Sequence, residues 1–549
     1  MISGSIIVLL LPLLTALPAY VFRQRRSLEV LMGMLACGLV VGVLLLPYDR
    51  SNNLLIGTLD LGRPIEFLGV TLRMHAYDQI ALSMIFLCAM ILFALSWRTS
   101  QGRTFIPLGL CVLSIMSAGL MIRPFVYSGL LFVISAALVA IMIQAEHIGE
   151  RSTHGAMRYL ILSTLALPAF LGAGYYFNQA NVSGLTEEAA AVLFDNASIF
   201  LGGGFVLLLG AFPLFTWTHL VANDAPPLTT AFVATVCSGT ISFFYSALKQ
   251  ELSWFRNLDG NTYIVAVSLI MIGVGGVLAW AQMSFSRLIA SALSVDIGAN
   301  LLMLNQHVHQ SVEAVALNVV SLTLSLGAVA IGLAVLRGKA RDDDFDELMG
   351  AARTGTSARL AALAICAGGM SLSGLPGSIG FVTRWVQART IASTDTELAV
   401  GLLVAFASVG IGFLRGVSAL ISEKPNATPQ AQPTNPDDAP KPPINAVPAL
   451  NAPAPSAFDA MPTEVTPMTE LLPQEMPLAA NEIGALKESQ SVFEPQPQDN
   501  MAETLAERIA PLAISLPVLI SLAIFYFGMS PVIFTTMAAS LSRLFSFYR

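Results

Sequence analysis

The sequence predicts an all-α integral membrane protein with about fourteen transmembrane helices. Of its 549 residues, 55% are hydrophobic and only 11% are charged, and the mean hydropathy is +0.70. A soluble domain carries about a quarter charged residues, so this composition excludes an ordinary soluble enzyme. Apolar runs of about 20 residues, the length that crosses a bilayer, recur along the chain. They are continuous rather than alternating, which indicates helices and not a β-barrel.

The apolar runs give the predicted helices in order. The first run is not interpreted as a signal peptide, because Arg23, Arg25 and Arg26 follow it instead of preceding it. The runs lie near residues 2–22, 28–47, 79–97, 104–122, 124–144, 156–177, 198–216, 226–248, 261–282, 287–305, 311–336, 358–391, 398–421 and 508–528.

Basic residues in the connections predict the orientation. The arginines after the first run place the first connection in the cytoplasm and the N-terminus outside, in what we expect to be a bacterial inner (plasma) membrane. Alternation of the helices then puts four more basic connections on the same side: Arg98 with Arg103, 146–158, Arg287, and 337–341. The connection 48–77 is expected outside, where alternating stretches at 59–61 and 67–72 predict a hairpin.

One segment, residues 423–506, differs in composition from the rest. It is rich in proline and acidic residues, and it cannot bury enough apolar area to offset its ordering entropy. We expect a disordered cytoplasmic linker that is able to recruit a cytoplasmic partner. The chain's formal charge of −7 comes from this segment, so there is no basic face for nucleic acid. Residues 507–549 are predicted to form a C-terminal transmembrane helix and an amphipathic tail.

Two apolar runs are interrupted by proline, at Pro213 and Pro376. Proline removes a backbone hydrogen bond and kinks a helix. If N-terminal helices at 1–103 precede two five-helix units at 104–248 and 261–422, each break falls in the fourth helix of its unit, which makes helices seven and twelve the broken ones. Broken helices at matching positions indicate an inverted-repeat transporter with an ion path near the membrane midplane. The alternative is that both prolines serve helix packing alone.

Five stretches, in this order, carry a resemblance to a known family. They read GFVLLLGAFPLFTW at 204–217, NDAP at 223–226, SRLIASALSVDIG at 286–298, GLPGSIGFVTRW at 374–385 and FLR at 413–415. Together they resemble the antiporter-like subunits of the membrane arm of respiratory complex I, the NADH:quinone oxidoreductase, and the related subunits of Mrp-type cation/proton antiporters. The resemblance covers roughly residues 60–422 and the final helix.

The resemblance implies a proton relay across the membrane midplane. In that family the relay uses an acid on the fifth helix, a lysine at the break of the seventh, a lysine or histidine on the eighth, and a lysine or acid on the twelfth. Buried charges are expensive in a bilayer, so each of them serves a purpose. The resemblance also implies other membrane-arm subunits as partners.

This sequence departs from the relay pattern at most of its positions. Leu208 stands at the seventh-helix position, the eighth-helix position falls at about Gly239, and the run 124–144 has no acid. The twelfth helix keeps a charge as Arg384, but arginine does not release its proton at physiological pH. The five lysines are all predicted in loops, at helix ends or in the linker. The sequence therefore predicts a dismantled relay.

Asp296, in the middle of the tenth run, is the first candidate among the remaining ionisable residues. An acid at that depth is a functional-site hypothesis, and the alternative is an ion pair with Arg384 that locks two helices together. Glu313, His307 and His309 flank the next junction. They indicate a proton exit or a metal site, although a solvated turn explains them as well.

Three further candidates lie near the breaks or at helix ends. His219 and Asp224 follow the seventh-helix break and could form the mouth of a half-channel or simply a polar loop. Arg415 matches a family position near the cytoplasmic end of the thirteenth helix, and snorkelling to lipid head groups is the simpler explanation.

No motif for a nucleotide, flavin, haem or metal appears, and the cysteines lie singly inside apolar runs. No cofactor is expected, and any redox chemistry belongs to partner proteins. The predicted function is an antiporter-like, proton-translocation-type membrane subunit of a complex I-like assembly, degenerate in its own proton conduction. The alternatives are a non-transporting interaction protein that recruits a partner through its linker, and a Mrp-like ion transporter.

Overall fold

The computed structural model describes residues 2–423, apart from short gaps at 49–51, 55–56, 68, 98, 100–101, 145–152, 183–185, 214, 258–260, 307–310 and 338–342. The predicted linker, the fourteenth run and the amphipathic tail lie outside the described residues. So do the two histidines His307 and His309.

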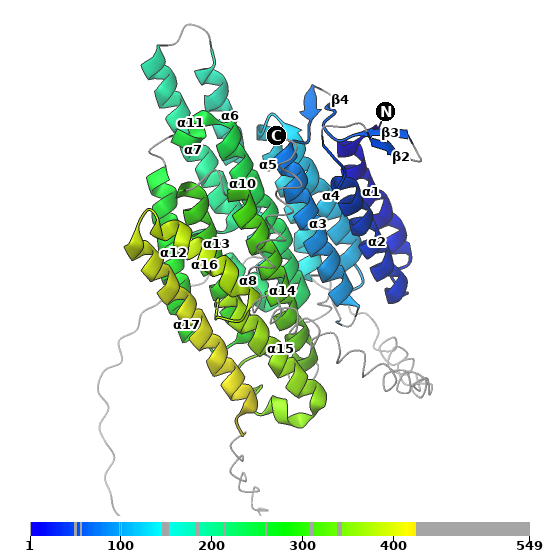
Figure 1. The fold of residues 1–549 in the computed structure, drawn as a ribbon, viewed down its shortest axis with the longest axis vertical. Coiled ribbons are helices and arrows are strands. Elements are labelled where there is room, and N and C mark those ends of the chain that lie inside the picture. The colour runs from blue at the N-terminus through cyan, green and yellow to red at the C-terminus, as the bar shows by residue number, and fades with distance from the viewer. Residues whose placement is uncertain are drawn as a thin grey trace, which may run out of the picture. The chain divides into compact units, whose positions relative to one another are not determined.

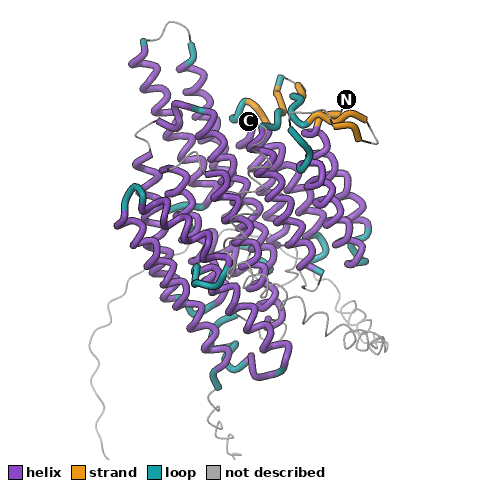
Figure 2. Tube along the Cα trace, viewed as in Figure 1, coloured by secondary structure: helices purple, strands orange, loops and turns teal. Residues whose placement is uncertain are grey.

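The described part of the chain is a bundle of helices that run side by side (Figures 1 and 2). The helices are α1 (Gly4–Val21), α2 (Arg26–Leu44), α3 (Ala76–Ser96), α4 (Phe105–Met121), α5 (Val126–Gln144), α6 (His154–Ala180), α7 (Glu187–Leu209), α8 (Thr216–Asp224), α9 (Pro227–Phe232), α10 (Ser238–Glu251), α11 (Ser253–Asn257), α12 (Asn261–Ala281), α13 (Phe285–Gln306), α14 (Ser311–Arg337), α15 (Thr356–Leu372), α16 (Ile379–Ala392) and α17 (Thr396–Ile421). A π-turn at Val233–Cys237 joins α9 to α10, and a 3-10 turn at Ala351–Thr354 precedes α15.

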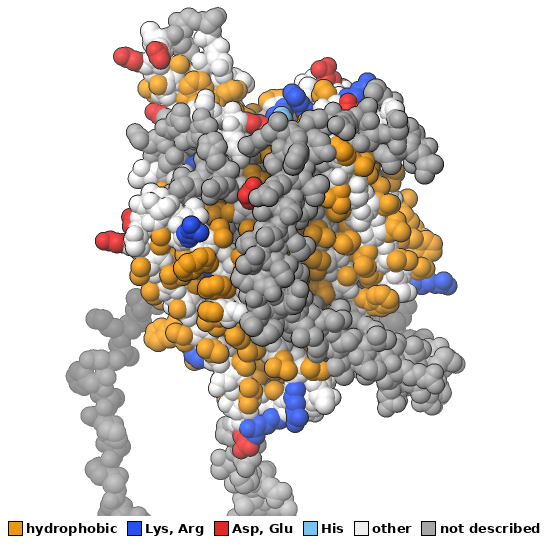
Figure 3. All heavy atoms as spheres, viewed as in Figure 1, with side chains coloured by type: hydrophobic (Ala, Val, Ile, Leu, Met, Phe, Trp, Pro, Cys, Tyr) orange, Lys and Arg blue, Asp and Glu red, His pale blue; other side chains and the backbone are white. Residues whose placement is uncertain are grey.

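Among the described residues, 11 helices are long and apolar enough to cross a membrane, and Phe105–Met121 and Thr356–Leu372 are shorter apolar helices. These coincide with the first thirteen predicted runs, so the chain is an integral membrane protein, as predicted. The total of fourteen is untested because the last run is not described. Hydrophobic side chains cover much of the face between the two ends (Figure 3). Such a surface suits lipid and not water.

Short strands gather at one end of the bundle, which we call the hairpin end. They are β1 (Ile2–Ser3), β2 (Asn52–Leu54), β3 (Gly57–Asp60), β4 (Ile65–Phe67), β5 (Val70–Leu72) and β6 (Ile122–Arg123). The prediction of a single hairpin from 59–61 and 67–72 was wrong in its pairing, because β3 pairs with β2, and β4 pairs with β5. A turn separates the two hairpins, with the Gly62 N–H donating to Asp60 Oδ1 at 3.1 Å. β6 adds to β5 and ties the α4–α5 connection to the second hairpin.

The most buried helices lie in the middle of the described bundle. In the apolar windows of Pro227–Glu251 and of α13, 94% of the residues are buried, against 28% for α6. The helix α14 packs against α3, α9, α15 and α16. These central helices therefore contact protein on most sides, and polar side chains on them have to be satisfied by neighbouring helices.

Both predicted helix breaks are present. The seventh crossing is α7 followed by α8, the fourth counted from α4, and the twelfth is α15 followed by α16, the fourth counted from α12. Each break contains a glycine in the left-handed region, Gly210 at φ +63° and Gly374 at φ +70°. A side chain on either glycine would collide with the half-helix that follows, at Trp217 and at Arg384 respectively. The breaks therefore depend on glycine both for backbone conformation and for space.

Gly374→Ala is expected to destabilise the protein more than Gly377→Ala, which lies in the same break. Both positions have positive φ, so each alanine costs about 1 kcal/mol in backbone strain. Only at Gly374 would the new Cβ lie 2.5 Å from Arg384 Cγ, and relieving that overlap adds about 1–3 kcal/mol. Nothing lies within 4 Å of a Cβ at Gly377. Thermal unfolding of the two variants in detergent measures the difference, and equal losses would contradict this account of the break.

Candidate functional site

A buried ion pair lies where α13 and α16 meet. Asp296 sits near the middle of α13 and Arg384 on the second half of the broken twelfth crossing, and they are 3% and 4% exposed. Arg384 Nη1 donates to Asp296 Oδ1. The break at 373–378 sets this contact, because it lets α16 begin beside α13 and Gly374 leaves room for the stem of Arg384.

Three amides complete the hydrogen bonding of the pair. Asn300 and Asn318 donate to Asp296 Oδ2 at 3.2 and 3.0 Å. Arg384 Nη1 also donates to Asn318 Oδ1 and Gln387 Oε1, both at 3.1 Å. Gln387 Nε2 donates back to Asn300 Oδ1 at 2.9 Å, which closes a ring of contacts among α13, α14 and α16. We call these five residues the α13–α16 network.

An aromatic ring covers the remaining face of the guanidinium. Arg384 Cζ lies 4.4 Å from the centroid of the Phe406 ring on α17, in a cation–π contact. Both oxygens of Asp296 accept hydrogen bonds, and the buried Nε of Arg384 has no partner among the described residues. Arginine retains its proton, and Arg384 holds the carboxylate through Nη1 alone. The arrangement suits a fixed link between helices.

The N-terminus of α13 is anchored by a loop that follows α14. Asp343 is 2% exposed, and its Oδ2 accepts from the Ser286 N–H at 3.0 Å and from Arg337 Nη2 at 2.9 Å. Burial raises the pKa of the Asp343 carboxyl, but Arg337 and the hydrogen bonds from Ser286 outweigh burial and hold that pKa below its usual 3.8. The stabilisation by Asp343 is therefore present at neutral pH and is lost only as the pH falls below 3.8. This anchor fixes the register of α13 and with it the position of Asp296.

The structure does not bring the other predicted site residues into the α13–α16 network. His219 on α8 contacts α13 at Ser291, with Nε2 3.1 Å from Oγ. Asp224 lies at the other end of α8, where its Oδ2 accepts from the Gly155 N–H at 2.8 Å and so caps α6. Glu313 is exposed in the first turn of α14.

Arg415 differs from the expectation that it reaches lipid head groups. Its Nη1 donates to the Trp280 carbonyl, and its Nη2 lies 3.5 Å from the Gln282 carbonyl oxygen. Arg415 therefore binds orphan carbonyls at the C-terminal end of α12, where a positive charge is favourable.

Lys249 is a buried polar residue that the sequence analysis did not single out. It does lie in the last turn of α10, as expected for a helix-end lysine, yet it is 1% exposed. Its Nζ donates to Asn305 Oδ1 on α13 and lies 5.4 Å from the centroid of the Tyr245 ring. Helix ends normally meet water, and the packing of α10 against its neighbours, α13 among them, places this one inside. Asn300 was also missed, although its position one turn after Asp296 signals a shared helix face.

The described residues offer no metal site. No group of three or more His, Cys, Asp or Glu among them could hold an ion. The five cysteines are separate and unpaired.

Removing one charge of the buried pair is expected to cost far more than removing both. Asp296→Asn leaves Arg384 charged and buried, which costs about 3–5 kcal/mol, whereas Asp296→Leu with Arg384→Met leaves no unpaired charge. The matched control is Glu423→Gln, which breaks a pair with Arg353 that is exposed on both sides and should change little. Unfolding temperatures of the variants in detergent check the order. A double variant no more stable than Asp296→Asn would contradict it.

Comparison with known proteins identifies relatives of this chain by sequence. The chain is similar to NADH-quinone oxidoreductase subunit N of Azorhizobium caulinodans, with 28% identity over 287 residues that cover 51% of this chain and 58% of the relative. Subunit N of Moorella thermoacetica is 25% identical over 421 residues, which cover 70% of this chain and 85% of the relative. The matches to the A. caulinodans, Methylobacterium nodulans and Pelobacter propionicus proteins each span under two thirds of the relative's length.

Solved structures share the fold at lower identity. A chain of the Mrp complex from Dietzia sp. DQ12-45-1b matches with a TM-score of 0.63 and 15% identity, and the match covers 76% of this chain and 80% of that one. A chain of respiratory complex I from Thermus thermophilus with bound aureothin matches with a TM-score of 0.60 and 16% identity, covering 95% and 97%. The family model for the NADH:quinone oxidoreductase/Mrp antiporter transmembrane region matches residues 127–411. Since that match spans more than half of the chain, the protein belongs to this family.

Proposed function

We propose that this chain is an antiporter-like membrane subunit of a complex I-type NADH:quinone oxidoreductase or a close relative, and that its own central proton relay has been replaced by a fixed ion pair. Family membership and the subunit N relatives support the first part. Other membrane-arm subunits are then its partners, and any redox chemistry belongs to other subunits of the assembly.

The α13–α16 network is the observation that carries the second part of the proposal. A relay needs groups that change protonation near neutral pH, and the carboxylate at this depth is bound to an arginine and two amides. The family resemblance implies an eighth-helix lysine at about Gly239, and there the neighbouring helix α14 leaves no space for a side chain. A Cβ on Gly239 would lie 2.9 Å from Val319 Cγ2 of α14. Leu208, at the seventh-helix position, is 4% exposed and packs in the apolar core.

The distribution of arginine supports an orientation. Arg26, Arg287 and Arg353 lie at helix ends opposite the hairpin end, as do Arg23 and Arg25. By the positive-inside rule that end faces the cytoplasm of a bacterial inner membrane and the N-terminus lies outside. In this orientation the segment 423–506 starts in the cytoplasm, where it could bind a cytoplasmic partner.

Purification through a tag is expected to bring down other membrane-arm subunits. Extraction of native membranes in mild detergent, followed by mass spectrometry, should find complex I-type subunits in near-stoichiometric amounts, because an obligate subunit stays in its assembly. A second sample lacking 425–500 should keep these subunits if they bind the helices. Recovery of the chain alone, or with unrelated proteins, would oppose the membrane-arm assignment and favour a stand-alone Mrp-like transporter or a scaffold.

Proteoliposomes of the isolated chain are expected to conduct protons no faster than empty liposomes. The measurement is internal pH, followed with a trapped dye after a potassium diffusion potential is imposed. The Asp296→Leu, Arg384→Met double variant is the matched control, because it keeps the helix contact without either charge. Flux that is present in the wild type and absent in the double variant would show that the pair conducts, and would contradict the loss of the relay.

A further inference from the structure

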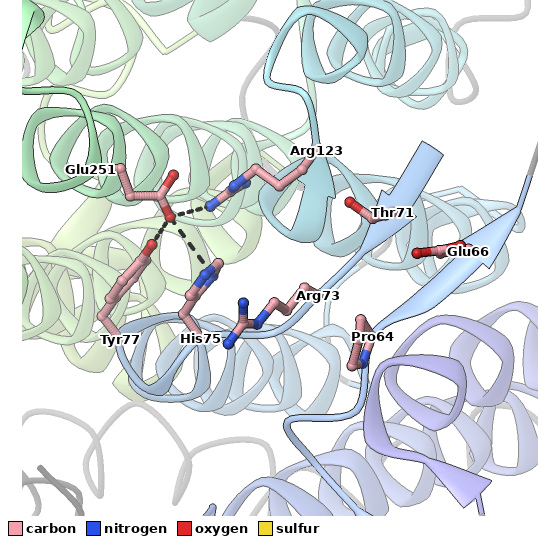
Figure 4. A pocket seen from close by; sticks show the side chains of 8 residues that line it. All are labelled: Pro64, Glu66, Thr71, Arg73, His75, Tyr77, Arg123 and Glu251. Atoms are coloured by element: carbon pink, nitrogen blue, oxygen red, sulfur yellow. Dashed lines mark hydrogen bonds and ion pairs between the residues drawn. The ribbon is translucent and has the colours of Figure 1, made fainter. Parts of the chain in front are cut away.

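A polar pocket opens at the hairpin end, far from the α13–α16 network in sequence and outside the proposed function. Its volume is about 460 Å³, which is within the range of small-molecule sites. The side chains around it come from the second hairpin, α3, the α4–α5 connection and α10 (Figure 4). The lining residues are Pro64, Glu66, Thr71, Arg73, His75, Tyr77, Arg123 and Glu251.

One wall of the pocket is held together by Arg123 and Glu251. Arg123 Nη1 donates to two backbone carbonyls, one at the end of α4 and one in β6, both at 3.0 Å. Its Nη2 donates to Glu251 Oε1 at 2.6 Å, and the same oxygen accepts from the Tyr77 hydroxyl (Figure 4). His75 Nδ1 lies 3.7 Å from that oxygen. Because these donors already have acceptors within the protein, this wall shapes the pocket before any ligand enters.

The second hairpin supplies the opposite wall, where three polar side chains share one face. Glu66 of β4 lies directly across from Thr71 of β5, and Arg73 follows Thr71 by two positions. Side chains that are two apart on a strand, or directly opposite across a pair, point to the same side. Figure 4 shows Glu66 and Thr71 on the side of the pocket away from Tyr77 and Glu251, with Arg73 between the two sides.

The functional groups on this hairpin face are not used by the described part of the chain. The Glu66 carboxylate, the Thr71 hydroxyl and the Arg73 guanidinium make no hydrogen bond or ion pair with the described residues. The backbone of Arg73 is nevertheless held, since its N–H donates to the Met121 carbonyl at 3.0 Å. The face therefore offers a cationic donor, a hydroxyl and a carboxylate acceptor to a ligand in the pocket.

The pocket lies where crossing helices reach the membrane surface. The apolar span Ala76–Ser96 begins beside it, and the span Pro227–Glu251 ends in it. A third span, Val126–Gln144, begins shortly after Arg123. The ends of crossing helices lie at the polar headgroup region of the bilayer, which places phospholipid phosphates and amines at the depth of this pocket.

We propose that the pocket binds the headgroup of a phospholipid that carries both a phosphate and a primary ammonium group. The phosphate oxygens accept hydrogen bonds from the Arg73 guanidinium and the Thr71 hydroxyl, and the ammonium group donates to the Glu66 carboxylate. The site stands whichever assembly the chain joins, because every residue in it belongs to this chain.

The mixed charges of the pocket select among headgroups. A purely anionic headgroup would pair with Arg73 but would also meet two carboxylates, Glu66 and Glu251. A quaternary ammonium group carries the required charge but has no N–H to donate to Glu66. A headgroup with a phosphate and a primary ammonium adds no net charge and pairs both free ionic groups. Phosphatidylethanolamine is therefore expected to bind more tightly than phosphatidylcholine or phosphatidylglycerol.

The first test is native mass spectrometry of the full-length protein, delipidated in detergent and titrated with each of these three lipids. The wild type should bind phosphatidylethanolamine about tenfold more tightly than phosphatidylcholine, the worth of one charge-assisted hydrogen bond. Glu66→Gln should remove most of that preference, and Arg73→Gln should weaken the binding of both lipids.

Arg63→Gln is the matched control, because Arg63 is an exposed arginine that precedes the same hairpin and does not line the pocket. It should keep both the affinity and the preference. Glu66, Arg73 and Arg63 are exposed, so unfolding temperatures without lipid should agree among the variants. Equal affinity of the wild type for the three lipids, or a preference that survives Glu66→Gln, would overturn the proposal.

The second test needs no variant and separates a lipid from a soluble phosphoester. Glycerophosphoethanolamine carries the same headgroup without acyl chains, and glycerophosphocholine is its N-methylated counterpart. The ethanolamine ester should displace bound phosphatidylethanolamine, but more weakly than added lipid does, because acyl chains add apolar contact. The choline ester should not displace it at the same concentration. Equal displacement by both esters would refute recognition of the ammonium group, and a soluble ester that binds as tightly as the lipid would refute a lipid site.

Discussion

The cost of an unpaired charge in the membrane interior governs where this chain places its ionisable residues. Removing a charge from water is unfavourable by several kcal/mol, about as much as a whole domain gains on folding, so a buried charge persists only with a partner and a full set of hydrogen bonds. Asp296 and Arg384 are each other's partner, and three amides and a phenyl ring supply most of the remaining contacts, with only partial hydrogen bonding of the guanidinium. The packing of α13, α14 and α16 follows from it, because each of these helices contributes a member of the network.

The helix breaks are what make the pairing geometrically possible. If the twelfth crossing were one continuous helix, α16 would not begin beside α13, and the aliphatic part of the Arg384 side chain would have no space. The break frees the backbone at residues 373–378, and Gly374 accepts a conformation and a contact that other residues cannot. The break in the seventh crossing has the same construction. Gly210 has a positive φ and lies against Trp217, so the residue beside this break is apolar. The same backbone motif therefore positions a charge at one break and an aromatic ring at the other.

The ends of the helices carry the remaining polar chemistry. At the end opposite the hairpins, Asp343 and Arg415 bind the backbone at helix termini. At the hairpin end, the carboxylates and guanidinium groups around His75 surround a pocket instead of closing it. The buried pair Asp296–Arg384 thus lies in the middle of the helices, and the polar groups of the hairpin end line a pocket.

The sequence by itself determined the membrane class, the first thirteen crossings, the two breaks and the family, because long apolar runs and Gly-Pro interruptions act locally and leave few alternatives. It also raised the pairing of Asp296 with Arg384 as an alternative to a transport site. Only the tertiary structure decided that these two residues touch, that Lys249 is buried although it lies at a helix end, and that His75, Arg123 and Glu251 meet. These contacts join residues more than 80 positions apart, or depend on which face of a helix a neighbour covers. Hydropathy along the chain carries no information about either, since lipid and protein bury an apolar helix equally well.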